Sequence, residues 1–133
     1  MNSIKSKLSD YFADRSDLVA VYLFGSQAGG ATHSTSDIDV ALLFNSGEIP
    51  AKEQIMQIED DLTSLFKQKV DLVILNHASP VIRMQVLRKG DRILERDHNA
   101  FIQFFIRTIN EYDDLKRVRS VNEKNILRGR IYG

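Results

Sequence analysis

Cysteine is absent from this chain of 133 residues. Its absence excludes disulfide bonds, a thiolate nucleophile, and zinc or iron–sulfur sites with cysteine ligands. Long apolar runs are also absent. None approaches the roughly 20 residues needed to cross a bilayer, and the N-terminal segment MNSIKSKLSD lacks the apolar stretch of a signal peptide. We therefore expect a soluble, cytoplasmic protein with no membrane partner.

The chain also lacks a net charge, because 18 Lys and Arg balance 18 Asp and Glu. A nucleic-acid-binding domain is usually basic over its contact face, so we expect no direct binding of nucleic acid. The charges are unevenly spread, however: residues 113–133 hold six basic and three acidic residues. Two interpretations of this basic tail stay open, a solvated helix face and a docking surface for an acidic partner.

The residues that are present indicate one ordinary globular domain. Hydrophobic residues make up 43% of the chain and charged residues 27%, a composition far from that of disordered proteins. A domain of this length buries roughly two-thirds of its unfolded surface, which supports a core of its own. No linker rich in Pro or Gly and no internal repeat divides the chain, so we expect a single domain over residues 1–133.

Hydrophobic patterning predicts an alternation of helices and strands. Three short apolar runs, residues 18–24, 38–44 and 70–75, predict buried strands. Helical spacing predicts helices at residues 3–15, from Pro50 to Phe66, from Ser79 to Gly90 and from Asp97 onward, and residues 91–95 fit a short edge strand. The pattern thus predicts an α/β domain in the order α-β-α-β-α-β-α. Periodicity alone does not decide whether the strands run parallel or mixed.

The exit from the first predicted strand carries the first chemical signal. Gly25 and Ser26 follow that strand directly. Glycine lets backbone amides approach a ligand closely and the serine hydroxyl adds a donor, so this exit suits the binding of phosphate. A plain tight turn would also explain a Gly-Ser pair, so the signal is weak by itself.

Three carboxylates stand where core packing has no use for them. Asp37 and Asp39 begin the second predicted strand, where residues i and i+2 point to the same face roughly 7 Å apart. Asp71 begins the third predicted strand. If that strand lies beside the second, all three acids converge on one edge of the sheet and repel one another. A pair of Mg²⁺ ions would resolve this conflict, because hard cations take carboxylate oxygens as ligands.

The spacing of these residues resembles the signature of the polymerase-β-like nucleotidyltransferase superfamily. Gly25-Ser26, ten intervening residues and Asp37-Ile38-Asp39 match that pattern throughout. The chain resembles still more closely the minimal nucleotidyltransferases, small antitoxins that act beside HEPN-domain toxins. The segments that carry this resemblance are YLFGS (22–26), SDIDVALL (36–43), VDLVIL (70–75), ASPVIRMQVLRKGDRIL (78–94), YDDLK (112–116) and ILRGRIYG (126–133).

The resemblance implies a fold and a function. The implied fold is a single nucleotidyltransferase-type domain with a small mixed central sheet flanked by helices, a catalytic core over residues 1–96 and a C-terminal helical segment over residues 97–133. The implied function is that of a Mg²⁺-dependent nucleotidyltransferase antitoxin. It would transfer AMP from ATP to a tyrosine of a partner HEPN ribonuclease toxin, within a hetero-oligomer, and thereby silence that toxin.

The resemblance also assigns roles to the residues singled out above. Gly25 and Ser26 would bind the nucleotide. Asp37, Asp39 and Asp71 would act as the catalytic residues and hold the metal, with two Mg²⁺ ions expected. One departure bears on nucleotide affinity: many members carry arginine shortly after the Gly-Ser pair, in a run like GSRARG, whereas this chain has the run GSQAGG.

Two alternative functions stay open. The chain could be an antitoxin that neutralises its toxin by binding alone, although a vestigial site would have no reason to keep mutually repelling acids. It could instead modify a small molecule, although no second domain is left to enclose such an acceptor. For the same reason, the surface that presents the acceptor must come from a partner protein. We expect this partner to contact the long final helix, which carries Phe101, Phe104, Phe105 and a basic end. A core role would also explain these aromatic residues.

Overall fold

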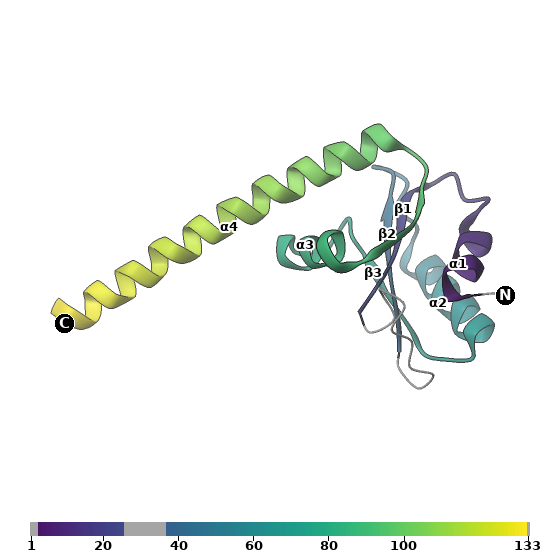
Figure 1. The fold of residues 1–133 in the computed structure, drawn as a ribbon, viewed down its shortest axis with the longest axis horizontal. Coiled ribbons are helices and arrows are strands. Elements are labelled where there is room, and N and C mark those ends of the chain that lie inside the picture. Colours follow the sequence, from purple (N-terminus) through teal and green to yellow (C-terminus); the bar gives the residue numbers. More distant parts are fainter. Residues whose placement is uncertain (1–2, 26–36, 133) are drawn as a thin grey trace.

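The computed structural model describes residues 3–25 and 37–132, with residues 122–132 described as backbone only. Its elements are α1 (Ile4–Phe12), β1 (Leu18–Phe24), β2 (Ile38–Phe44), α2 (Lys52–Phe66), β3 (Val70–Ile74), α3 (Pro80–Lys89), β4 (Asp91–Glu95) and α4 (His98–Tyr132). The four helices flank a central sheet (Figure 1). The predicted α/β class is therefore confirmed.

The sheet is mixed and has the strand order β3-β2-β1-β4. β2 and β3 run parallel, whereas β1 is antiparallel to both β2 and β4. The expected short strand over residues 91–95 is β4, at one edge of the sheet. Because β4 lies between α3 and α4, the chain has one strand that the predicted order α-β-α-β-α-β-α does not count, and the alternation of helices and strands is kept there. Between β1 and β2 it stays untested, since residues 26–36 lie outside the described residues.

Two hydrophobic layers hold the helices on the sheet. α1 and α2 cover one face, where Leu8, Phe12, Ile58 and Leu62 pack against inward residues of the strands. α3 and α4 cover the other face (Figure 1). Because β1 and β2 are covered on both sides, nearly all of their residues are buried, as the continuously apolar runs predict.

The aromatic residues of the final helix belong to the second of these layers. Phe101 and Phe104 are 7% and 5% exposed and pack against the sheet, and the half-buried Phe105 packs beside them. The core interpretation of these side chains is thus confirmed for Phe101 and Phe104. A partner that binds α4 must therefore contact residues of this helix other than Phe101 and Phe104.

Local signals place the helix ends where the sequence predicts them. The Ser3 hydroxyl accepts a hydrogen bond from the Ser6 amide at 3.1 Å, and the Ser79 hydroxyl accepts one from the Ile82 amide at 3.2 Å. Gly90 ends α3 with φ −77°, an extended conformation rather than a left-handed cap. Glycine is needed there for space, because a Cβ atom would lie 2.6 Å from a backbone oxygen of the helix.

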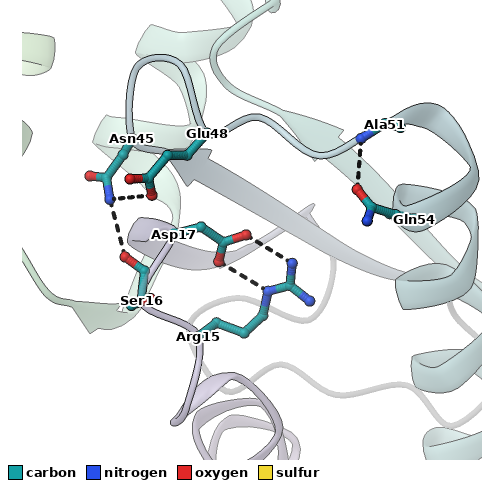
Figure 2. Close-up of polar contacts among 7 residues, drawn as sticks. All are labelled: Arg15, Ser16, Asp17, Asn45, Glu48, Ala51 and Gln54. Carbon is teal, nitrogen blue, oxygen red and sulfur yellow. Dashed lines mark hydrogen bonds and ion pairs between the residues drawn. The ribbon is translucent and has the colours of Figure 1, made fainter.

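Side-chain hydrogen bonds fix the loops at the end of the sheet where β1 begins and β2 ends (Figure 2). The Arg15 guanidinium pairs with the Asp17 carboxylate at 2.9 Å, and the Asn45 side-chain amide donates to the Ser16 carbonyl and to Glu48, each at 3.1 Å. These contacts hold the chain where it enters β1 beside the chain that leaves β2. At the opposite end of the same strands, β1 ends beside Gly25 and β2 begins after Asp37.

A buried arginine joins α3 to the end of β3 and to α4. The Arg83 guanidinium donates to the backbone carbonyls of Leu75 and Asn76, each at 2.8 Å, and pairs with Glu111 on α4 at 3.2 Å. It also lies over the Phe104 ring, 5.1 Å from its centre. Arg83 therefore joins α3 to the end of β3 and to α4.

α4 is much longer than its packed part. Its first turns lie against the sheet and α3, whereas its C-terminal half extends beyond them (Figure 1). Every residue from Lys116 to Val121 is exposed. No helix among the described residues is long and apolar enough to cross a membrane.

Candidate active site

Three strands bring the predicted carboxylates to one end of the sheet, which we call the carboxylate edge. β1 ends there, and its partner β2 and the parallel strand β3 both begin there. Phe24 lies opposite Asp39, and Asp39 in turn lies opposite Asp71 in the register of the parallel pair. Neighbouring strands are about 4.8 Å apart, so these two acids stand side by side. The condition stated for the convergence of the acids, that the third strand lies beside the second, is therefore met.

The remaining predicted residues surround this pair. Asp37 directly precedes β2 and is exposed, while Asp39 is half-buried. Gly25 directly follows β1. Ser26 lies outside the described residues, so its place in the site stays a prediction.

Gly25 is required by the carboxylate of Asp39. Its φ is +74°, in the left-handed region that favours glycine. A Cβ atom at this position would lie only 2.3 Å from Oδ2 of Asp39, far inside van der Waals contact. The sequence explains Gly25 by the close approach of a ligand to the backbone. The structure adds a second reason, which is the space that Asp39 occupies.

The electrostatics of the edge oppose a bare carboxylate at Asp39. Burial raises the pKa of Asp39 above its ordinary value, and the charges of Asp71 and Asp37 raise that pKa further. Ionisation of Asp39 is therefore less favourable than that of an isolated aspartate. A cation bound at this edge would reverse the balance by favouring the charged carboxylates.

Lys69 is a cation beside these acids that the sequence interpretation missed. Its ammonium nitrogen lies 3.9 Å from Oδ1 of Asp71, and both side chains are largely accessible to solvent. Its backbone carbonyl accepts a hydrogen bond from the Ile38 amide at 3.0 Å, which ties it to the start of β2. The available signal was its place two residues before Asp71. Such an exposed pair contributes little to stability. Lys69 is therefore of interest for the positive charge that it places beside the carboxylates.

The donor set of this edge fits Mg²⁺. Among the residues described, no three His, Cys, Asp or Glu side chains are gathered into a group that could hold a metal ion unaided. Mg²⁺ is usually bound by one or two carboxylates together with substrate phosphates rather than by a cage of protein ligands alone. An in-register pair of aspartates, in which burial and the neighbouring acid both raise the pKa of Asp39, suits that mode of binding.

Comparison with known proteins points to the same chemistry. Residues 6–99 match the family described as polymerase beta, nucleotidyltransferase. The chain is 32% identical over 102 residues to the protein adenylyltransferase MntA of Shewanella oneidensis, which covers 77% of this chain and 71% of that protein. It is 28% identical over 117 residues to the protein adenylyltransferase MntA of Aphanizomenon flos-aquae, covering 82% of this chain and 78% of that protein.

Solved structures resemble this fold over almost its whole length. A crystal structure of a toxin–antitoxin with AMP-PNP holds a chain with a TM-score of 0.77 and 28% identity, covering 94% of this chain and 99% of that one. A structure of tri-AMPylated Shewanella oneidensis HEPN toxin in complex with MNT antitoxin gives a TM-score of 0.72 and 27% identity, covering 92% and 95%. The matched family segment includes Gly25 and all three aspartates. This chain belongs to the polymerase beta nucleotidyltransferase family, as its similarity to two protein adenylyltransferases also indicates.

Proposed function

We propose that this chain is a Mg²⁺-dependent protein adenylyltransferase that moves AMP from ATP to a tyrosine of a partner HEPN toxin and so acts as its antitoxin. The observation that carries the proposal is the in-register pair of Asp39 and Asp71, with Gly25 held against Asp39. The similar solved structures support the substrate and the partner. One is a toxin–antitoxin with AMP-PNP, and another contains an AMPylated HEPN toxin.

Each residue of the edge has a proposed task. Gly25 and Ser26 bind the triphosphate through backbone amides and a hydroxyl. Asp37, Asp39 and Asp71 hold Mg²⁺, and we expect two ions. When bound, Mg²⁺ supplies positive charge that neutralises the phosphates and the charge that develops on them during transfer.

The transfer is a displacement at the α-phosphorus of ATP. The tyrosine oxygen forms a bond to the α-phosphorus, and the bond from that phosphorus to the oxygen bridging to the β-phosphate breaks, so that pyrophosphate leaves. We assign to Asp71, whose side chain is accessible to solvent, the task of taking the hydroxyl proton. The chain thus contributes positioning and charge stabilisation, which are the main sources of catalysis in such reactions.

The size of the chain favours a protein acceptor over a small molecule. We propose that residues 1–96 form the catalytic core and that residues 97–133 form a helical segment for partner contact. The described elements after the sheet consist of α4 alone, which cannot enclose a small acceptor. The surface that presents the acceptor tyrosine would therefore be supplied by the toxin.

The persistence of silencing tests this function against an antitoxin that acts by binding alone. The HEPN toxin is incubated with this chain, ATP and Mg²⁺, the two proteins are separated, and the ribonuclease activity of the toxin is measured. We expect the toxin to stay inactive after separation, and to regain activity when ATP is omitted or when Asp37→Ala/Asp39→Ala replaces the wild type. Recovery of activity with the wild type and ATP would favour silencing by binding alone.

A further inference from the structure

The C-terminal half of α4 stands clear of the rest of the molecule (Figure 1). Val118 and Val121 on this part of the helix are 57% and 55% exposed. They are three residues apart and so lie on one face of the helix. In the part of the chain that the structure describes, no other element covers them. Most of the stability of a helix in a protein comes from packing of its apolar face. This indicates that a partner molecule covers the face that carries the two valines.

The two valines belong to a stripe of regular spacing. Asp114, Arg117, Val118 and Val121 line a shallow, mainly apolar stretch of the helix surface. They occupy positions i, i+3, i+4 and i+7, the spacing by which one helix face anchors in a partner. Arg117 forms an ion pair with Asp114, which holds its side chain along the rim of the stripe. We call these four residues the distal stripe.

The charges around the distal stripe define the chemistry of its partner. Within the stripe Asp114 balances the charge of Arg117, while the charged residues beside it, Lys116 and Arg119, are both basic. Further along the helix the sequence adds Lys124, Arg128 and Arg130 against a single acid, Glu123. The complementary surface is acidic with an apolar centre. A second copy of this chain fits poorly, because it would bring two basic tails together.

We propose that the distal stripe is the docking surface for the HEPN toxin, which would meet it with an acidic face that has an apolar centre. This inference rests on the proposed function, because that function identifies the toxin as the partner. Chains similar to this one over 94% of its length, which includes most of α4, occur in solved toxin–antitoxin structures. Docking on this arm would be separable from the chemistry, since the stripe shares no residue with the carboxylate edge.

Glutamine substitutions test the stripe without weakening the helix. Val118→Gln/Val121→Gln removes the apolar anchors, and glutamine has a higher helix propensity than valine. Ile106→Gln is the matched control, because Ile106 is 53% exposed on the same helix but lies on its packed half. Affinity for the cognate HEPN toxin is measured with the full chain by titration calorimetry. We expect at least a tenfold loss for the double variant and less than a twofold change for the control.

Kinetics and salt provide further readouts. In AMP transfer, the double valine variant should raise the KM for the toxin and leave kcat close to that of the wild type, because the stripe holds the partner and does not touch the reacting atoms.

The affinity of the wild type for the toxin should fall as the salt concentration rises, and Lys116→Gln/Arg119→Gln should reduce that dependence. A double variant that keeps the wild-type KM would overturn the proposal.

The outcomes separate this inference from the proposed function. Asp37→Ala/Asp39→Ala should lose AMP transfer and keep the wild-type affinity for the toxin. Unchanged binding by the double valine variant, or an equal loss from Ile106→Gln, would overturn the distal stripe as the docking surface while leaving the function intact. A wild-type dimer that the valine variant dissociates would assign the stripe to a second copy instead. Failure of the wild type to bind the HEPN toxin would overturn the proposed function itself.

Discussion

Gly25 and Asp39 show how closely the backbone and the charges of the site depend on each other. The strand β1 ends in a left-handed glycine whose missing side chain leaves room for the Asp39 carboxylate. Sequence spacing identifies both residues as parts of one signature. It does not reveal that they touch, because that contact depends on the antiparallel register of β1 and β2.

Gly25→Ala should destabilise the fold and abolish AMP transfer. The added methyl group meets Asp39 at 2.3 Å, and the φ of +74° is strained for alanine, so we expect a loss of about 1–3 kcal/mol in the free energy of unfolding. Gly47→Ala is the control, because Gly47 has φ +81° but no atom within 4 Å of an added Cβ. Urea titration should show a smaller loss for Gly47→Ala. Equal losses would mean that backbone strain, and not contact with Asp39, accounts for the effect.

Asp39→Asn should stabilise the metal-free protein at neutral pH. Because the pKa of Asp39 is raised in the folded state, the folded protein holds more protons than the unfolded chain over the range between the two pKa values, and stability falls as pH rises through that range. Removing the charge should raise the free energy of unfolding by on the order of 0.5 kcal/mol at pH 7, which is the scale of cross-strand charge pairs.

Thermal unfolding across pH checks this sign. The gain in Tm for Asp39→Asn should be present at pH 7 and vanish below the ordinary range of carboxyl pKa values, where both states are protonated. Asp60→Asn, at an exposed position on α2, should change Tm little at either pH. A lower Tm for Asp39→Asn at pH 7 would mean that the Asp39 charge stabilises the fold.

At the scale of elements, most of the fold could be predicted from the sequence. The apolar runs place β1, β2 and β3, and the caps at Ser3 and Ser79 place the starts of α1 and α3. These signals are local. The pairing of β4 with β1 and the parallel pairing of β2 with β3 are set by tertiary packing, which periodicity does not encode.

The candidate site was predictable to the same extent. An aspartate at the start of an apolar strand is visible in the sequence, so Asp37, Asp39 and Asp71 could be named in advance. That Asp39 and Asp71 lie opposite each other required the order of the strands. Lys69 and Arg83 were missed because nothing in helix or strand patterning separates a functional or buried cation from a solvated one.

Arg83 links three elements, and its loss should be costly. Arg83→Met removes the donors to the carbonyls of Leu75 and Asn76 and the pair with Glu111. We expect a loss of about 2–4 kcal/mol in the free energy of unfolding, because buried acceptors are left without partners. The control, Arg107→Met on the exposed face of α4, should change it by less than about 0.5 kcal/mol. Similar urea midpoints for the two variants would contradict the role given to Arg83.

At the scale of the whole molecule, a compact sheet domain carries a projecting helical arm (Figure 1). The packed part of α4 contributes Phe101 and Phe104 to the core, while residues 116–121 contribute no buried side chain. The stability of the domain therefore depends on the packed part of α4 and not on residues 116–121. The domain should be stable by itself, and the arm should matter only when the partner is present.

A chain truncated after Leu115 tests this division. It should unfold within about 0.5 kcal/mol of the full chain, because the described residues that it removes are exposed. Its affinity for the HEPN toxin should be lost. A large fall in stability would mean that the arm packs on the domain, which would contradict its role as a free docking element.

The most direct test of the central claim is the intact mass of the HEPN toxin after incubation with ATP, Mg²⁺ and this chain. An Asp37→Ala/Asp39→Ala variant is run in parallel. We predict that the toxin gains the mass of one or more adenylyl groups with the wild type and none with the variant, and that peptide mapping places the group on a tyrosine. A toxin that is bound and silenced while its mass stays unchanged would contradict adenylyl transfer by this chain.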